Sequence, residues 1–170
     1  MTGAMGLQGG MLKGEILLNL DTEEDDEIDI GCAGGIDVTA IRNYETETLN
    51  NNEYIGYQID VKGLKGGHSG VEIHLGRGNA NKILNRLLYG QESNELRLVS
   101  FEGGSLRNAI PRESVAKVII ASMYDEAFVF DMQEVITDIK AEFKTTEPNL
   151  TIEIVKADLP AKVMELGVQE

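Results

Sequence analysis

Four stretches in the middle and second half of the chain are rich in apolar residues and are predicted to be strands; in the first, Ile55, Tyr57, Ile59 and Val61 alternate with other residues, as in a strand with one buried face. The expected strands are residues 54–62, 96–101, 115–122 and 150–155. Between the first two strands, apolar residues recur at the helix period over residues 79–89, and Gly90 closes that helix. A second helical stripe, with Asp125 as its expected N-cap and Pro148 after its end, precedes the last strand.

From residue 54 onward the order of elements is therefore strand, helix, strand, strand, helix, strand. This is the split βαβ pattern, so we predict an α+β fold with a ferredoxin-like antiparallel sheet and two helices on one face. Residues 36–47 also alternate, and a polar turn at 50–53 separates them from the strand at 54–62. This spacing predicts that 36–47 and 54–62 form an antiparallel pair.

The N-terminal region has a different character. Residues 1–14 show no periodicity, whereas residues 15–21 (EILLNLD) form a short apolar run that ends in an acid. We expect a buried parallel strand here, with Asp21 at its carboxyl end. The acidic turn that follows is not a calcium loop, because its sixth position is Asp26 instead of glycine and its twelfth is Cys32.

Charge and cysteine content restrict the candidate partners and compartment. The chain has 15 Lys and Arg against 29 Asp and Glu, a net charge of −14, which disfavours nucleic acid and anionic membranes as partners. With one cysteine, the chain has no internal disulfide and no thiolate zinc site. We find no secretory signal and no apolar run long enough to span a bilayer, so we expect a cytoplasmic protein.

Few residues are candidates for chemistry. Both histidines, His68 and His74, lie in the glycine-rich stretch LKGGHSGVEIHLGRGNAN. From the residues alone, His68 is either a loop histidine or an imidazole presented at a site, and His74 has a packing or hydrogen-bonding role. Asn108, in the loop GGSLRNAIP, either stabilises a turn or binds a ligand, and Asp21 is a cap, an ion-pair partner or a metal ligand. No phosphate-binding motif and no H-E-x-x-H motif occurs.

Three stretches taken together point to a family. LLNLDTEEDDEIDIGCAGGID, LKGGHSGVEIHLGRGNAN and GGSLRNAIPRE resemble the aminoacyl-histidine dipeptidases (Xaa-His or β-alanyl-histidine dipeptidases), which belong to the dinuclear-zinc peptidases with an inserted lid. GGHSG occurs across that wider family, whereas VEIHLGRGNAN is more specific to the dipeptidase branch. The resemblance implies that residues 1–35 are a remnant of an α/β catalytic domain, that residues 36–158 are the lid and dimerisation domain, and that residues 159–170 are a tail.

The resemblance also implies roles for three residues. Asp21, in NLDTE, matches a carboxylate ligand of one of two zinc ions. His68, in GGHSG, resembles the lid histidine that reaches an active site, typically that of the partner subunit, and stabilises the oxyanion formed when zinc-bound hydroxide attacks. Asn108 resembles the lid asparagine that helps to hold the dipeptide.

The other metal ligands and the general base of the family have no counterpart in this sequence. We therefore expect an inactive fragment that binds zinc weakly or not at all, from a zinc metallopeptidase that hydrolyses Xaa-His dipeptides as a homodimer paired through the lid sheet. Two alternatives are a related lid-bearing zinc hydrolase of tripeptides or N-acyl amino acids, and a stand-alone module for dimerisation or small-ligand binding.

Overall fold

The computed structural model describes residues 38–49, 53–91, 94–104 and 106–165, and isolated positions before residue 38 (6, 8–11, 13–16, 18, 26, 28 and 36). The chain divides into two units, Met1–Ile41 and Arg42–Glu170, and every helix and strand that the structure describes lies in the second. Asp21 lies outside the described residues, as does most of the strand predicted at 15–21. None of the described helices is long and apolar enough to cross a membrane.

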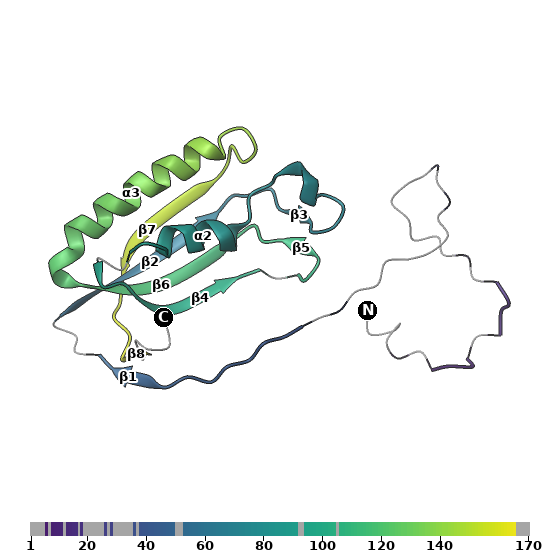
Figure 1. Cartoon of the computed structure of the whole chain (residues 1–170), viewed down its shortest axis with the longest axis horizontal. Coiled ribbons are helices and arrows are strands. Elements are labelled where there is room, and N and C mark those ends of the chain that lie inside the picture. Colours follow the sequence, from purple (N-terminus) through teal and green to yellow (C-terminus); the bar gives the residue numbers. More distant parts are fainter. Residues whose placement is uncertain are drawn as a thin grey trace. The chain divides into compact units, whose positions relative to one another are not determined.

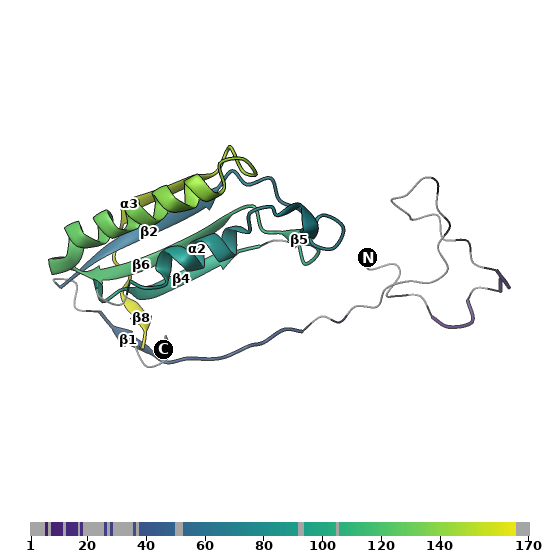
Figure 2. The ribbon, with the colours of Figure 1, turned by 45° about the horizontal axis from the view of Figure 1, so that its top comes forward.

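The main sheet confirms the predicted fold. It has four antiparallel strands in the order β4-β6-β2-β7: β2 (Tyr54–Lys62), β4 (Arg97–Gly103), β6 (Ser114–Ala121) and β7 (Thr151–Ala157). Helix α2 (Ala80–Leu88) connects β2 to β4. A short 3-10 turn, η3 (Ser122–Tyr124), leads into helix α3 (Asp125–Glu142), which connects β6 to β7. Both helices cover the same face of the sheet (Figures 1 and 2).

The core lies between this face and the two helices, as the alternation in the sequence requires. On β2, Tyr57, Ile59 and Val61 are buried against the helices, while the residues between them face the open side of the sheet. The helices contribute fully or almost fully buried side chains to the same core: Ile83, Leu84 and Leu87 from α2, and Phe128, Met132, Ile136 and Ile139 from α3. Each such side chain contributes about 1.5–3 kcal/mol of hydrophobic stabilisation, so the core is sufficient to fix the helices on the sheet.

The two helix starts differ from each other. Helix α2 begins after Asn79, whose side-chain oxygen accepts a hydrogen bond from the Lys82 N–H at 3.2 Å. The predicted cap of α3 is wrong, because Asp125 is already helical and Tyr124 is the cap residue. The Asp125 carboxylate is drawn to the sheet instead, where it accepts hydrogen bonds from the Tyr57 hydroxyl and, at 2.8 Å, from the Lys156 ammonium.

The predicted pairing of residues 36–47 with residues 54–62 is also wrong. Strand β1 (Thr46–Thr48) pairs antiparallel with β8 (Lys162–Met164), which lies in the expected tail. The reason is that both edges of β2 are already occupied, one by β6 and the other by β7. The β1–β8 pair contributes Val163 to a small second core with Leu49 and Ile119 on the open side of the main sheet.

Candidate functional site

Two short strands bring the predicted site loops together. Strand β3 (Gly67–His68) pairs antiparallel with β5 (Ala109–Ile110), so that His68 lies opposite Ala109. Just beyond this pair, the Ser69 N–H donates to the Asn108 carbonyl at 2.9 Å. The β3–β5 pair projects from one end of the main sheet (Figure 1). Two of the three predicted site residues, His68 and Asn108, are therefore neighbours in space, although they are 40 positions apart in the sequence.

The imidazole of His68 is held in one orientation by its own loop. Its Nδ1 atom accepts hydrogen bonds from the main-chain N–H groups of Gly70 and Val71, both at 3.1 Å. Because Nδ1 is an acceptor in this arrangement, the proton of the neutral ring lies on Nε2. The half-buried ring therefore offers an Nε2–H donor, which is the type of group that binds a carbonyl oxygen or an oxyanion.

A charged pair inside the loop supports this arrangement. Glu72 accepts the main-chain N–H of His68 at 2.7 Å with one oxygen and pairs with Arg77 at 2.6 Å through the other. Arg77 in turn donates to the Gly66 carbonyl at 2.5 Å. The hydrogen bond from His68, helped by the charge of Arg77, lowers the pKa of the Glu72 carboxyl below its usual range.

Gly67 is required by the same arrangement. Its φ of +144° is a conformation that L side chains rarely adopt, and an added Cβ would lie 2.3 Å from the Arg77 guanidinium. Glu72 and Arg77 are not among the site residues predicted from the sequence. The only signal for them was a pair of opposite charges within the glycine-rich stretch that carries His68.

The second histidine does not join the site. His74 lies in the 3-10 turn η1 (Ile73–Leu75), and all three residues of this turn are exposed. The packing role expected for His74 is therefore wrong, because the expected strand alternation is replaced by a tight helical turn.

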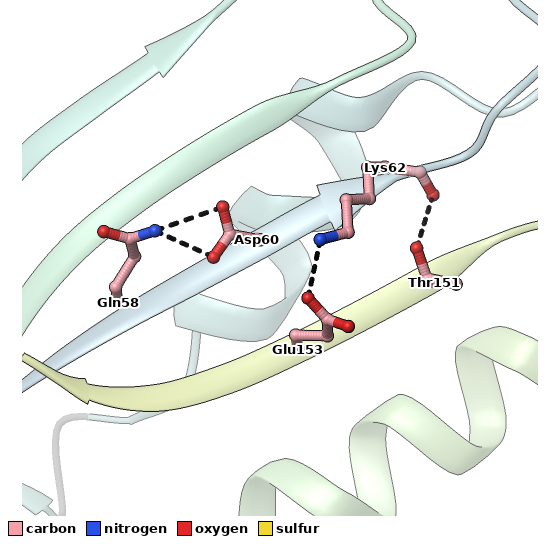
Figure 3. A network of polar contacts seen from close by, with 5 residues as sticks. All are labelled: Gln58, Asp60, Lys62, Thr151 and Glu153. Carbon is pink, nitrogen blue, oxygen red and sulfur yellow. Dashed lines mark hydrogen bonds and ion pairs between the residues drawn. The ribbon is translucent and has the colours of Figure 1, made fainter.

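A cleft of about 740 Å³ opens beside the β3–β5 pair, and Gly67 and Ala109 belong to its lining. Its charged lining residues carry both signs: Asp60, Glu102 and Glu113, and Lys62, Lys65 and Arg112. Figure 3 shows the polar network at its β2 side, where Lys62 pairs with Glu153 at 2.6 Å and Gln58 donates to Asp60 at 2.9 Å. The Lys62–Glu153 pair is exposed, and such pairs contribute little to stability.

The described residues do not form a metal site. Within residues 38–165, apart from the gaps in the description, no three His, Cys, Asp or Glu side chains come together as possible ligands. A protein zinc site needs three or four ligands. Asp21, the predicted ligand, lies outside this part of the chain.

Comparisons with known proteins agree on one family. Residues 59–151 match the family described as peptidase dimerisation domain. Over 156 residues the chain is 46% identical to the cytosol non-specific dipeptidase of Escherichia coli (strain K12), a match that covers 89% of this chain and 31% of that protein. The chain thus spans about a third of the length of this curated relative.

Solved structures give a consistent result. The crystal structure of aminoacylhistidine dipeptidase from Vibrio alginolyticus matches with a TM-score of 0.76 and 39% identity, over 99% of this chain and 34% of that one. Aminobenzoyl-glutamate utilization protein from Klebsiella pneumoniae matches with a TM-score of 0.50 and 12% identity, over 65% of this chain and 29% of that one. At this identity the second match shows a likeness of fold alone.

Proposed function

Because the chain belongs to the peptidase dimerisation domain family, we propose that it serves as the lid and dimerisation domain of a dipeptidase. In this proposal residues 36–158 form the lid, and residues 1–35 belong to the catalytic domain. The substrates are dipeptides, among them Xaa-His dipeptides. The names of two of the relatives described above, a cytosol non-specific dipeptidase and an aminoacylhistidine dipeptidase, support this substrate class.

The observation that carries the proposal is the pairing of β3 with β5, which places His68 beside Asn108. An oxyanion develops on the substrate when a peptide carbonyl is attacked, and a donor that is already oriented stabilises it with little reorganisation. We assign that role to the Nε2–H of His68. Asn108, exposed at the neighbouring turn, is assigned to hold the dipeptide through its amide.

The motif resemblance implies that the proposed enzyme is a zinc peptidase. The name of the Escherichia coli relative, cytosol non-specific dipeptidase, supports a cytoplasmic peptidase. Asp21 is proposed as one zinc ligand on the strength of its NLDTE motif. Because the described residues do not form a metal site, the roles assigned to His68 and Asn108 are contacts to the substrate and not to a metal ion.

A chimera tests the role of His68. The region of the Escherichia coli dipeptidase that aligns with this chain is replaced by the aligned residues of this chain, and hydrolysis of an Xaa-His dipeptide is measured. We expect His68→Ala to lower kcat by about 100- to 1,000-fold, the scale for loss of an oxyanion donor. His74→Ala, an exposed histidine of the same segment, is the matched control and leaves kcat unchanged. A kcat that survives His68→Ala in an active chimera would rule out the assigned role.

A further inference from the structure

We propose that Glu147 is a positioning residue for His68, and that its carboxylate holds together the two ends of the segment that presents the histidine. The segment runs from residue 64 to residue 79 and contains β3 and η1. The proposal rests on the proposed function for its catalytic meaning, but the contacts that support it do not depend on that function.

Glu147 is an acidic side chain in an unusual place. It is only 2% exposed and is among the largest fully buried side chains in the described part of the chain. One carboxylate oxygen accepts the main-chain N–H of Lys65 at 2.8 Å, and the other accepts the main-chain N–H of Gly78, also at 2.8 Å. Lys65 lies at the start of the segment and Gly78 at its end, so a single carboxylate holds the two ends of the segment close together.

Gly78 packs closely against Glu147, with no space for a larger residue at position 78. A Cβ at Gly78 would lie 2.8 Å from the Leu64 side chain and 3.2 Å from Cγ of Glu147. A buried carboxylate is costly unless hydrogen bonds satisfy it. Both N–H groups need an acceptor and lie outside helices and strands, so the two-oxygen carboxylate meets a requirement that a glutamine amide, with one acceptor and one donor group, cannot meet.

The backbone that carries Glu147 is itself fixed. The Glu147 N–H donates to the Phe143 carbonyl at 2.8 Å, and the Leu150 N–H donates to the Glu147 carbonyl at 3.0 Å. Leu150 belongs to the main core. Glu147 therefore ties the two ends of the segment to the residues that follow α3, while the β3–β5 pair ties Gly67 and His68 to the neighbouring loop. These two attachments together set where His68 lies relative to the main sheet.

The test follows the imidazole of His68 in Glu147→Gln. The His74→Gln background leaves one histidine, so the ring ¹⁵N resonances report His68 alone. We expect the parent chain to show the single Nε2–H tautomer. In Glu147→Gln, we expect the ring to average between tautomers, and the amide hydrogens of Lys65 and Gly78 to exchange roughly tenfold faster or more, the scale for losing a hydrogen bond to a charged group.

Glu142→Gln is the matched control. It makes the same chemical change on an exposed side chain of α3 that pairs with Arg86 at 2.8 Å, and it should leave the His68 tautomer and both exchange rates unchanged. A folded Glu147→Gln protein with the parental tautomer and parental exchange would overturn the proposal.

A second measurement decides the question if Glu147→Gln does not fold. In the parent chain, the Lys65 and Gly78 amide hydrogens should exchange at least tenfold more slowly than that of Gly76, an exposed residue of the same segment. Equal rates for the three would overturn the proposal without any variant.

The chimera separates this proposal from the proposed function. If His68 has the proposed function and Glu147 positions it, Glu147→Gln lowers kcat in the chimera. In a chimera that already carries His68→Ala, Glu147→Gln should then cause no further loss of kcat. If His68→Ala leaves kcat unchanged, the proposed function of His68 fails, while the ring resonances still decide whether Glu147 positions it.

Discussion

At the scale of single residues, the Glu72 carboxylate is the polar centre of the His68 segment. Its two oxygens serve different partners, the His68 N–H and the Arg77 guanidinium. Both partners favour the ionised form, which is why the pKa of Glu72 is lowered. Its pKa in the ordered loop is therefore below that in the unfolded chain, so the ordered loop is favoured at a pH above the unfolded value. That advantage is lost as the pH falls through the lowered value.

An acid titration checks this reasoning. The amide resonance of His68 should shift with a midpoint below the usual range for a glutamic acid, because its N–H donates to Glu72. Glu72→Gln should abolish this step, whereas Glu134→Gln, an exposed residue of α3, should preserve it. A midpoint at or above the usual glutamic acid value would contradict the assigned hydrogen bond.

At the scale of elements, a single carboxylate joins three of them. Asp125 opens α3 and accepts hydrogen bonds from Tyr57 of β2 and Lys156 of β7. The hydrogen bond from Lys156, and to a smaller extent that from Tyr57, lowers the pKa of Asp125. Burial, and to a smaller extent the Asp125 carboxylate, raises the pKa of Tyr57. The Tyr57 ring also packs on Phe128 of α3, with 5.1 Å between ring centroids. The start of α3 is thus fixed to the sheet by polar and aromatic contacts at one point.

Tyr57→Phe isolates the polar part of this contact. It keeps the ring and removes the hydroxyl that donates to Asp125, so we expect the free energy of unfolding to fall by about 1–2 kcal/mol. Urea denaturation measures this change, and the pKa of Asp125 should rise toward its ordinary value. Tyr89→Phe removes the hydroxyl of a tyrosine that is 81% exposed and should have no effect. Equal stability of Tyr57→Phe and the parent would show that the hydrogen bond makes no net contribution.

The same scale explains which parts of the structure the sequence predicts. Helix α2 was predictable because its signals are local: an apolar period between Asn79 and Gly90. The partner of β1 was not, because β1 has three residues and pairs with a strand more than a hundred positions away. Strands β3 and β5 have two residues each, too few to show a period, so only motif resemblance indicated their loops. Glu147 gave no signal at all, since its partners are main-chain N–H groups distant in sequence.

At the scale of the whole molecule, the main sheet has two edge strands, β4 and β7. An edge strand offers unpaired main-chain donors and acceptors to another chain. The two edges differ: β7 pairs with β2 in continuous register, whereas β4 has a register shift between Leu98 and Ser100 where it pairs with β6. Membership in the dimerisation domain family supports a homodimer, and the motif resemblance supports pairing through this sheet.

A homodimer paired through the sheet has a distinct signature in solution. Sedimentation should give twice the mass of the chain, and the dimer should strengthen as salt is raised, because each copy carries a net charge of −14 and the repulsion between copies is screened.

Amide exchange measured at low and high protein concentration should then slow in one edge strand, β4 or β7, while the central strands β2 and β6 serve as the internal control. A dimer that protects neither edge would contradict sheet pairing, and a monomer at every concentration and salt would contradict dimerisation by this chain alone. The first result would indicate a dimer built on another surface of the domain, so the two measurements together decide between pairing through a sheet edge, pairing elsewhere, and no dimer of this chain alone.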